Sequence, residues 1–527
     1  MMPKLLHQMV QDAALRHPDA AAVRCDGASL SWGDLASRAN GLARVLLEAG
    51  MARRERVAVL LAKGLRVPEA FYGVLSAGGT LVPIDPRSPA EQVIRILRAT
   101  GVTRLVTEPG KRDLAATALA GCPEVAHVVG LRPEDAVARP CVPWEEVPPS
   151  GEAPAVDVIE HDPSYILHTS GSTGIPKLIL HTHHSAMSFV DWAVAEYGIT
   201  REDRLTNASS HHTCFATFDY YAAARAGAAT VILTPSVLMM PSSLAELLER
   251  ERVSMWYSVP TALVQLSLRG DLESRDLRSM RWVLFAGETF PGKHLHRVMR
   301  QIPSARFSHV YGSTEVNVCT YYHLPPASEL AGPLPIGRAC STTRTLVVDE
   351  QGRPVSGGEP GELLIGGSTV MSGYWGEPER NRDILVRRPA PGELEEVYFR
   401  TGDRVRALEN GQLAFVARAD RQVKVRGYRV ELEEVEAALL SLASVEEAAA
   451  FTVPDAEGSL AIRAAVVASG EGSAEREILG GLRRILPPQA VPERIHAVEA
   501  MPRTPTGKVD SRALAAWLTE ENAPHGR

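Results

Sequence analysis

Short apolar, β-branched segments alternate with helical segments along most of this 527-residue chain. VAVLL at 57–61 and TLVPID at 80–85 have the pattern of buried strands, and PEAFYGVLSA between them has the spacing of a helix. Strands joined through helices of this length require right-handed crossovers. The sequence therefore predicts an α/β fold built on parallel-type βαβ sheets.

The same alternation returns in the second quarter of the chain. The expected strands are TVIL, SMWYSVP, RWVLFAGE and ARFSHVYGSTE (230–233, 254–260, 281–288 and 305–315), with helices around 242–252, from Thr261, and up to about Arg300. In parallel sheets ligands collect at the carboxyl ends of the strands. Two of those ends, AGE (286–288) and YGSTE (311–315), are small and polar, so they predict a binding site.

The last third of the chain changes character. Residues 346–415 form glycine- and proline-punctuated strands typical of an irregular β-rich portion. Residues 420–440 are expected to form a strand leading into an amphipathic helix, and this last part of the chain, about 100 residues, suits a small α+β unit. We expect a large N-terminal domain at 1–419 and a small C-terminal domain at 420–527.

Composition excludes several classes of protein. The chain has 56 Lys+Arg and 63 Asp+Glu, a net charge of -7, without the basic stripe that nucleic-acid binding needs. Its 6 cysteines are scattered without a CxxC pair, which favours a reducing compartment over a zinc or iron–sulfur site. No signal-peptide core or membrane-spanning run is present. A soluble cytoplasmic protein is expected.

The most informative segment is YILHTSGSTGIPK at 165–177. Its hydroxyls and glycines suit a loop that binds a polyphosphate through side-chain and backbone donors, and its lysine adds a cation. It differs from a Walker loop because a proline precedes the lysine; a flexible connection is the alternative reading of such a segment. The candidate phosphate-binding residues are Thr169, Ser170, Gly171, Ser172, Thr173, Gly174 and Lys177.

Six further motifs follow this loop in order. They are FDYY (218–221), AGE (286–288), YGSTE (311–315), YFRTGD (398–403), RADRQVKVRGYRVELEEVE (418–436) and PTGKVD (505–510). Together they resemble the superfamily of acyl-adenylate-forming enzymes, which contains acyl-CoA synthetases, luciferases and the adenylation domains of nonribosomal peptide synthetases. The resemblance covers essentially the whole chain.

The resemblance implies an ATP site. Tyr311 would stack on adenine, Thr314 would donate to a phosphate, and Glu315 would hold Mg²⁺, which prefers hard carboxylate oxygens. Asp403 would accept from both ribose hydroxyls, with Arg418 beside it. The remaining implied ATP contacts are Gly287, Glu288, Gly312 and Ser313.

The resemblance also implies a mobile lid. Lys508 would be the catalytic lysine, a cation that stabilises the charge shared between the attacking carboxylate and the α-phosphate. Asp420 matches the hinge about which the small domain rotates between half-reactions. After that rotation, Arg426 and Gly427 would line the entry of an incoming thiol.

The substrate follows from FDYY within the same resemblance. Amino-acid-activating members carry an aspartate at the position of Asp219, where it pairs with the substrate's α-ammonium group. The alternative is that local backbone donors satisfy the Asp219 carboxylate. The lining is similar to that of free-standing L-prolyl-AMP ligases, which favours L-proline, and a small aliphatic amino acid such as valine or alanine is also compatible. The implied lining is Tyr220, Ala223, Tyr257, Leu284, Ala286, Val310, Val318 and Cys319.

The acceptor is expected to be a separate carrier protein bearing phosphopantetheine. Only 19 residues follow Lys508, and LGG at 479–481 lacks the serine that would carry the prosthetic group. Coenzyme A is the competing thiol, and an inactive nucleotide-binding relative is the remaining alternative. Four positions depart from the superfamily's usual residues, namely Leu178, His309, Ser313 and Ala417, and His309 is interpreted as a packed residue.

Overall fold

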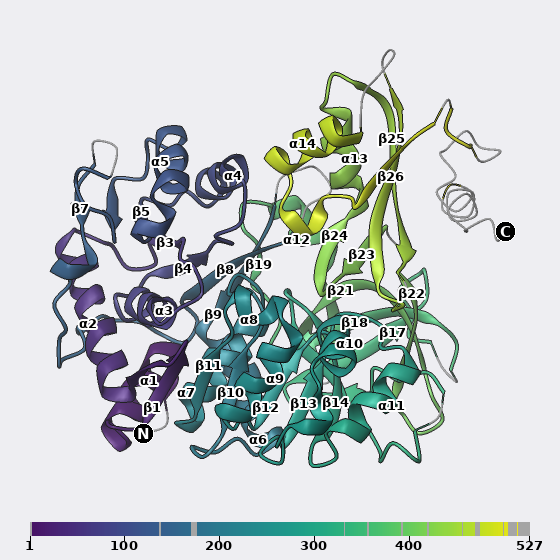
Figure 1. Cartoon of the computed structure of the whole chain (residues 1–527), viewed down its shortest axis with the longest axis horizontal. Coiled ribbons are helices and arrows are strands. Elements are labelled where there is room, and N and C mark those ends of the chain that lie inside the picture. Colours follow the sequence, from purple (N-terminus) through teal and green to yellow (C-terminus); the bar gives the residue numbers. More distant parts are fainter. Residues whose placement is uncertain are drawn as a thin grey trace.

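The structure is a computed structural model that describes residues 3–135, 139–169, 176–330, 332–355, 358–390, 394–418, 421–455, 457–468, 475–498, 500–503 and 514. Within these ranges two large sheets dominate, and the predicted parallel α/β fold is confirmed. Figure 1 shows them as neighbouring lobes, with the C-terminal elements above the second lobe.

The first large sheet has eight strands and is parallel through its middle. Its order is β19 (Gly373–Tyr374), β9 (Lys177–Thr182), β8 (Pro163–Thr169), β4 (Thr80–Pro83), β3 (Arg56–Val59), β5 (Arg104–Val106), β6 (His127–Val129) and β7 (Cys141–Val142). β8 and β9 pair antiparallel, so the predicted phosphate loop connects two adjacent strands.

The second large sheet has nine strands. Its order is β16 (Arg338–Ala339), β15 (Asn317–His323), β14 (Arg306–Ser313), β13 (Trp282–Phe285), β12 (Met255–Ser258), β10 (Arg204–Asn207), β11 (Ala229–Ile232), β1 (Ala21–Cys25) and β2 (Ala28–Ser31). Parallel pairing runs from β14 to β1, as the alternating pattern predicts.

Helices cover both faces of these sheets. In β12, Met255 and Tyr257 belong to one buried cluster while Trp256 belongs to another, because alternate residues point to opposite faces. The cluster shared by both sheets includes α1 (Leu6–Arg16), α2 (Trp32–Glu48), α3 (Arg66–Ser76) and α6 (His183–Tyr197). The outer faces are covered by α4 (Ala90–Thr100) and α5 (Arg112–Gly121), and by α9 (Pro241–Arg250), α10 (Pro260–Arg269) and α11 (Gly292–Gln301).

Helix α2 begins with a capping box. The Asp34 backbone N–H donates to Ser31 Oγ at 3.0 Å, and the Ser31 N–H donates to Asp34 Oδ2 at 3.3 Å, a reciprocal capping box. The short elements of the large region are η1 (Pro109–Lys111), η2 (Trp144–Glu146), η3 (Thr217–Ala222), α7 (Ala223–Ala226), α8 (Pro235–Met239) and η4 (Leu272–Ser274).

The β-rich portion forms a five-stranded antiparallel sheet. It contains β17 (Thr343–Val348), β18 (Gly361–Gly367), β21 (Leu394–Ala407), β20 (Leu385–Ala390) and β22 (Leu413–Arg418), with α12 (Pro378–Ile384) beside it. The C-terminal elements are a three-stranded sheet, β25 (Val445–Pro454), β26 (Leu460–Ala468) and β27 (Arg494–Ala497), packed with α13 (Leu432–Leu440), α14 (Glu475–Ile485) and η5 (Pro488–Ala490).

One local expectation is corrected. Residues 420–440 were expected to contain a single strand before the helix, but the structure has a two-stranded hairpin, β23 (Gln422–Val425) and β24 (Tyr428–Glu431). Arg426 and Gly427 form its turn with φ of 50° and 80°, which reverses the chain. This hairpin projects from the C-terminal elements toward the large sheets (Figure 1).

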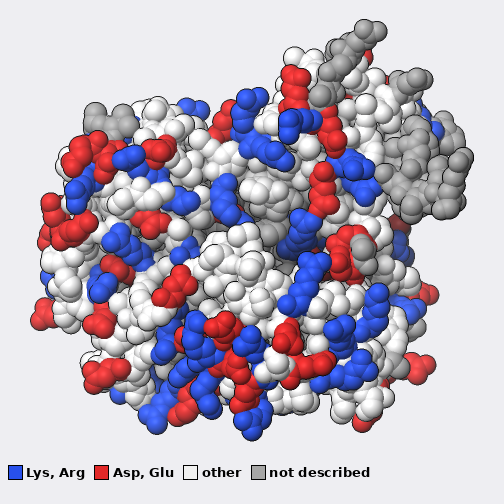
Figure 2. All heavy atoms as spheres, in the orientation of Figure 1, with Lys and Arg blue, Asp and Glu red and all other residues white. Residues whose placement is uncertain are grey.

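Charges of both signs are mixed over the face shown in Figure 2, and neither sign forms a continuous stripe there. In the described part of the chain, no helix combines the length and the apolar character needed to cross a membrane.

Candidate active site

The two polar strand ends meet, as the sequence predicts. Residues 286–287 follow β13 and residues 311–314 follow or end β14, and both segments line one small cavity at the edge of the nine-stranded sheet. The hairpin closes this cavity from the other side. Its lining is Phe189, Cys214, Phe215, Tyr257, Ala286, Gly287, Tyr311, Gly312, Ser313, Thr314, Val316, Asn317, Val318, Thr401, Asp403, Arg418, Gln422, Lys424, Gly427 and Arg429.

Glu315 is the most deeply buried acid of this site. Its carboxylate is 0% exposed and accepts from Arg429 Nη1 at 2.8 and 2.7 Å and from the Tyr374 hydroxyl at 2.7 Å. Burial opposes ionisation, but Arg429 and Tyr374 outweigh it and lower the pKa of Glu315 to about 2. The group is therefore a permanent anion, and a cation from the hairpin neutralises it here.

Asp403 and Tyr311 are joined directly. The Tyr311 hydroxyl donates to Asp403 Oδ2, and Arg418 Nη1 donates to Asp403 Oδ1 at 2.6 Å. Lys424 of the hairpin lies 5.8 Å from the centre of the Tyr311 ring. Three residues assigned to nucleotide binding by the sequence thus lie together, although they come from β14, β21 and β22.

The hairpin occupies most of this site. The cavity measures about 80 Å³, the space of a few water molecules, and is too small for a nucleotide triphosphate. Lys177, at the start of β9, is 5% exposed and pairs with Glu431 of the hairpin. Burial lowers the pKa of Lys177, and Glu431 opposes that change. A polyphosphate that used Lys177 or Glu315 would have to displace Glu431 and Arg429 first.

Glu288 fixes the hairpin turn. Its Oε1 accepts from the Gly427 backbone N–H at 2.7 Å, and its Oε2 accepts from the Thr261 hydroxyl at 2.6 Å. A Cβ at Gly427 would lie 2.3 Å from Val259 Cγ1, so only glycine allows this approach. Glu288, which the resemblance assigns to ATP, is in this orientation a clamp between the hairpin and α10.

Asp219 lies in η3 and is not part of the cavity lining. Its side chain is 0% exposed, Oδ2 accepts from Asn207 Nδ2 at 2.9 Å, and Oδ1 has no hydrogen-bond partner in the part of the chain that the structure describes. Burial raises the pKa of Asp219 well above its usual value, an effect that Asn207 and the nearby Lys63 oppose. The aspartate is enclosed as expected, but it faces β10 rather than the cavity.

The predicted acyl pocket is only partly exposed to the cavity. Tyr257, Ala286 and Val318 line it. Tyr220, Ala223, Leu284 and Val310 are buried in the same apolar cluster without lining it, and Cys319 belongs to the cluster around Tyr311.

Sequence reasoning missed two residues that line the cavity next to Tyr257, namely Cys214 and Phe215. Phe215 stacks on Tyr257 with ring centres 4.4 Å apart, and Cys214 precedes it. Burial raises the pKa of the Cys214 thiol to about 11, so it is neutral. The loop between β10 and η3 carries no motif, and only its proximity to FDYY in sequence could have indicated it. His309 is packed as interpreted, stacked on Phe285 and bound to the Pro335 carbonyl at 2.8 Å.

Several predicted residues lie outside the described ranges. These are Ser170, Gly171, Ser172, Thr173, Gly174, Asp420 and Lys508. The described ends of the phosphate loop are Thr169 and Lys177, which face each other across β8 and β9. Thr169 Oγ1 is buried and has no hydrogen-bond partner among the described residues, which fits a donor held for a ligand.

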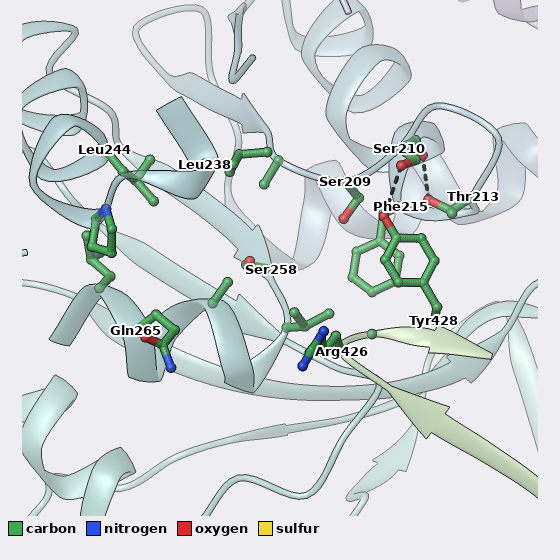
Figure 3. Close-up of a pocket in the computed structure, with 16 residues that line it drawn as sticks. Ser209, Ser210, Thr213, Phe215, Leu238, Leu244, Ser258, Gln265, Arg426 and Tyr428 are labelled. Atoms are coloured by element: carbon green, nitrogen blue, oxygen red, sulfur yellow. Dashed lines mark hydrogen bonds between the residues drawn. The ribbon is translucent and has the colours of Figure 1, made fainter. Parts of the chain in front are cut away.

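A second cavity of about 210 Å³ lies on the other side of the hairpin turn (Figure 3). It shares Phe215 and Gly427 with the first cavity. Its walls combine hydroxyls with aliphatic groups, and Arg426 and Tyr428 of the hairpin form one side. The other lining residues are Ala208, Ser209, Ser210, Thr213, Leu238, Pro241, Leu244, Ser258, Val259, Ala262, Gln265 and Leu266.

Family comparisons agree with this arrangement. The profile of the family described as AMP-binding enzyme matches residues 10–375, and that of the AMP-binding enzyme C-terminal domain matches residues 434–508. The chain belongs to the AMP-binding enzyme family. The resemblance seen in the sequence motifs is confirmed, and this AMP-binding enzyme is an AMP-forming ligase.

Three relatives illustrate the similarity. The chain is 32% identical to an L-proline–[L-prolyl-carrier protein] ligase from Pseudomonas fluorescens, over 97% of this chain and 99% of the relative. It is 35% identical to a protein of the same name from Streptomyces coelicolor, over 92% and 91%. Among solved structures, the amide bond synthetase McbA from Marinactinospora thermotolerans has a TM-score of 0.87 at 26% identity, covering 97% of this chain and 99% of that one.

Proposed function

We propose that this enzyme adenylates an amino acid, with L-proline favoured, and then transfers the aminoacyl group to the phosphopantetheine thiol of a separate carrier protein. The two proline ligases that match almost end to end support the substrate and the acceptor. The observation that carries the proposal is the hairpin, which closes the cavity that we assign to the nucleotide and borders a second cavity at the same turn.

The proposed reaction has two steps. First, a substrate carboxylate oxygen attacks the α-phosphorus of ATP and pyrophosphate leaves. Second, the thiol sulfur attacks the acyl carbon, its proton is lost, and AMP leaves. Lys508 would stabilise the first transition state, with Thr314, Asp403 and Arg418 binding the nucleotide.

A magnesium ion fits this scheme. Glu315 is an anion with a pKa of about 2, and it already binds a cationic group, so its donor chemistry suits a hard cation once Arg429 withdraws. Bound there, Mg²⁺ would supply neutralisation of the triphosphate. We assign residues 1–419 to the nucleotide and acyl sites and residues 420–527 to the lid, hinged at Asp420.

The hairpin orientation suits the second step. Glu431 pairs with Lys177, which is assigned to phosphate, and Arg429 pairs with Glu315, which is assigned to the metal. These pairs are compatible with a site that pyrophosphate has left. The 210 Å³ cavity then suits the thiol arm, because phosphopantetheine alternates amide and aliphatic segments that match hydroxyl and aliphatic walls. We place this reaction in the cytoplasm, where ATP and reduced thiols are present.

Pyrophosphate exchange with a panel of acids tests the proposal. We expect L-proline to give the strongest exchange, small aliphatic amino acids less, and acids without an amine none. Transfer to a phosphopantetheinylated carrier, compared with coenzyme A, then tests the acceptor. Pyrophosphate exchange confined to acids that lack an amine would contradict the amino-acid substrate. Turnover with coenzyme A alone would contradict the carrier protein as acceptor.

A second candidate substrate is a carboxylic acid without an α-ammonium group. Asp219 does not line the cavity, and among its described lining residues the only acid is Asp403, beside the predicted ribose position. The neutral Cys214 thiol and the Phe215–Tyr257 pair would suit an uncharged ring.

Asp219→Asn separates the two candidates. If Asp219 pairs with an ammonium, the variant should raise the KM for the amino acid by about tenfold or more, because a charge-assisted hydrogen bond is lost. Exchange with neutral acids is the internal control. An unchanged KM for the amino acid would show that Asp219 is not the amine's partner.

We expect Asp219→Asn to increase the stability of the folded chain, by an amount that depends on pH. Burial raises the pKa of Asp219 in the folded chain above its unfolded value near 4, so wild-type stability falls as pH rises above about 4. Asp219→Asn removes this loss, and its free energy of unfolding should exceed wild type by at least about 1 kcal/mol at pH 7 but not at pH 4. Denaturant titrations at both pH values measure it. A variant that is less stable at pH 7 would contradict the raised pKa.

A further inference from the structure

A triangle of hydrogen bonds joins the hairpin to the large region at the rim of the second cavity. The Tyr428 hydroxyl lies 3.0 Å from Arg87 Nη2 and 3.1 Å from Ser210 Oγ, and Arg87 Nη2 also donates to Ser210 Oγ at 3.2 Å. Figure 3 shows the contact between Tyr428 and Ser210. Tyr428 begins β24 and Arg87 follows β4, so the triangle connects two separate parts of the chain.

Asp85 holds Arg87 in position for this contact. Asp85 is 1% exposed and accepts from the Arg87 backbone N–H at 3.0 Å, from Nε at 3.1 Å and from Nη2 at 2.8 Å. A bidentate pair of this kind fixes the plane of the guanidinium. Because Asp85 is only two residues away in the same loop, Arg87 is already oriented whether or not the hairpin is docked.

We propose that Arg87 is a positioning residue for thiol transfer, which acts through Tyr428 to hold the hairpin in the orientation described here. This inference rests on the proposed function. The contact between Arg87 and Tyr428 exists only when the hairpin is docked, so its free energy favours that orientation over any in which the hairpin has withdrawn. No motif in the sequence indicated Arg87.

The role can be tested with Arg87→Gln and Tyr428→Phe, made singly and together. We expect each single variant to lower the ratio of pantetheine-dependent AMP release to pyrophosphate exchange by about tenfold, the value of a hydrogen bond to a charged group. The double variant should match Tyr428→Phe, because both single variants remove the bond between Arg87 and Tyr428, and Tyr428→Phe also removes the one to Ser210. Arg112→Gln, an arginine of α5 that is 55% exposed, is the control and should keep the wild-type ratio.

Hydrogen exchange gives a second measurement that needs no substrate. The Gly427 amide donates to Glu288 across the same interface, so it reports docking directly. It should exchange about tenfold faster in Arg87→Gln and Tyr428→Phe than in wild type or Arg112→Gln. Tyr428→Phe keeps the Asp85–Arg87 pair intact and so covers the case in which Arg87→Gln fails to fold.

The outcomes are distinct. Equal protection of Gly427 in all variants, or single effects that multiply to about a hundredfold in the double variant, would overturn the role of Arg87 through Tyr428. A different result would contradict the proposed function alone. In that case the Gly427 amide is protected in the wild type and less protected in Arg87→Gln, but the wild type gives no pyrophosphate exchange with any acid.

Discussion

Glu315→Gln is expected to lower the rate of substrate-dependent pyrophosphate exchange by a factor of about 100 to 1,000. The side chain is fully buried and its pKa is about 2, so it is an anion at every pH at which the enzyme would be assayed. Glutamine keeps the shape and removes the charge. The variant therefore cannot neutralise a cation at the point where the triphosphate is proposed to bind.

The loss should appear in the chemical step and not in folding alone. Glu362→Gln is the matched control, because Glu362 pairs with Arg400 on the neighbouring sheet, where that arginine is about half exposed. Glu362→Gln should keep exchange within about twofold, since surface ion pairs contribute little. Thermal unfolding of both variants measures any loss of stability. Glu315→Gln with near wild-type exchange would remove this residue from the proposed metal site.

The fold was predictable because its determinants are local. The short β-branched strands and the polar ends at 286–288 and 311–315 each depend on neighbouring residues in sequence. Parallel pairing then brings the two polar ends together, since adjacent parallel strands end at the same edge of a sheet. That part of the site followed from the pattern alone.

The acyl end of the site could not be predicted in the same way. Residues 217–222 form a π-type turn, in which the usual helical spacing no longer tells which side chain faces inward. Phe218 packs against Tyr257 with ring centres 5.3 Å apart, while Asp219, the next residue, accepts a hydrogen bond from Asn207. The motif FDYY identifies the segment but not the direction of its aspartate.

The hairpin contacts were also beyond the sequence. Arg429 with Glu315, Glu431 with Lys177 and Tyr428 with Arg87 join residues that are more than 100 positions apart. Each pair depends on how the C-terminal elements dock, and docking of separate units leaves no periodic signal in either one. The resemblance implies a mobile lid, and the structure shows which groups the hairpin contacts in one orientation.

Arg429→Met should have the opposite effect to Glu315→Gln on the two half-reactions. In the orientation described here the guanidinium is the cation that neutralises Glu315, so methionine would leave a carboxylate buried without its charge partner whenever the hairpin docks. Leaving one partner of a buried pair costs about 3 to 5 kcal/mol. Docking, and with it thiol transfer, should fall by a factor of about 100 or more. Pyrophosphate exchange should fall far less, because Glu315 then has no internal competitor for a metal cation.

The charge and the geometry of Arg429 can be separated with Arg429→Lys. A lysine keeps the cation, but its ammonium sits on a side chain of different shape from that of Arg429, whose Nη1 alone reaches both oxygens of Glu315, so thiol transfer should recover only in part. Single-turnover transfer from preformed aminoacyl adenylate isolates this step from adenylation. If Arg429→Met transfers at the wild-type rate, the ion pair does not stabilise the transfer orientation. If Arg429→Met instead loses pyrophosphate exchange and thiol transfer equally, Arg429 acts on nucleotide binding. That result would refute the idea that Arg429 and a metal ion occupy Glu315 in alternate half-reactions.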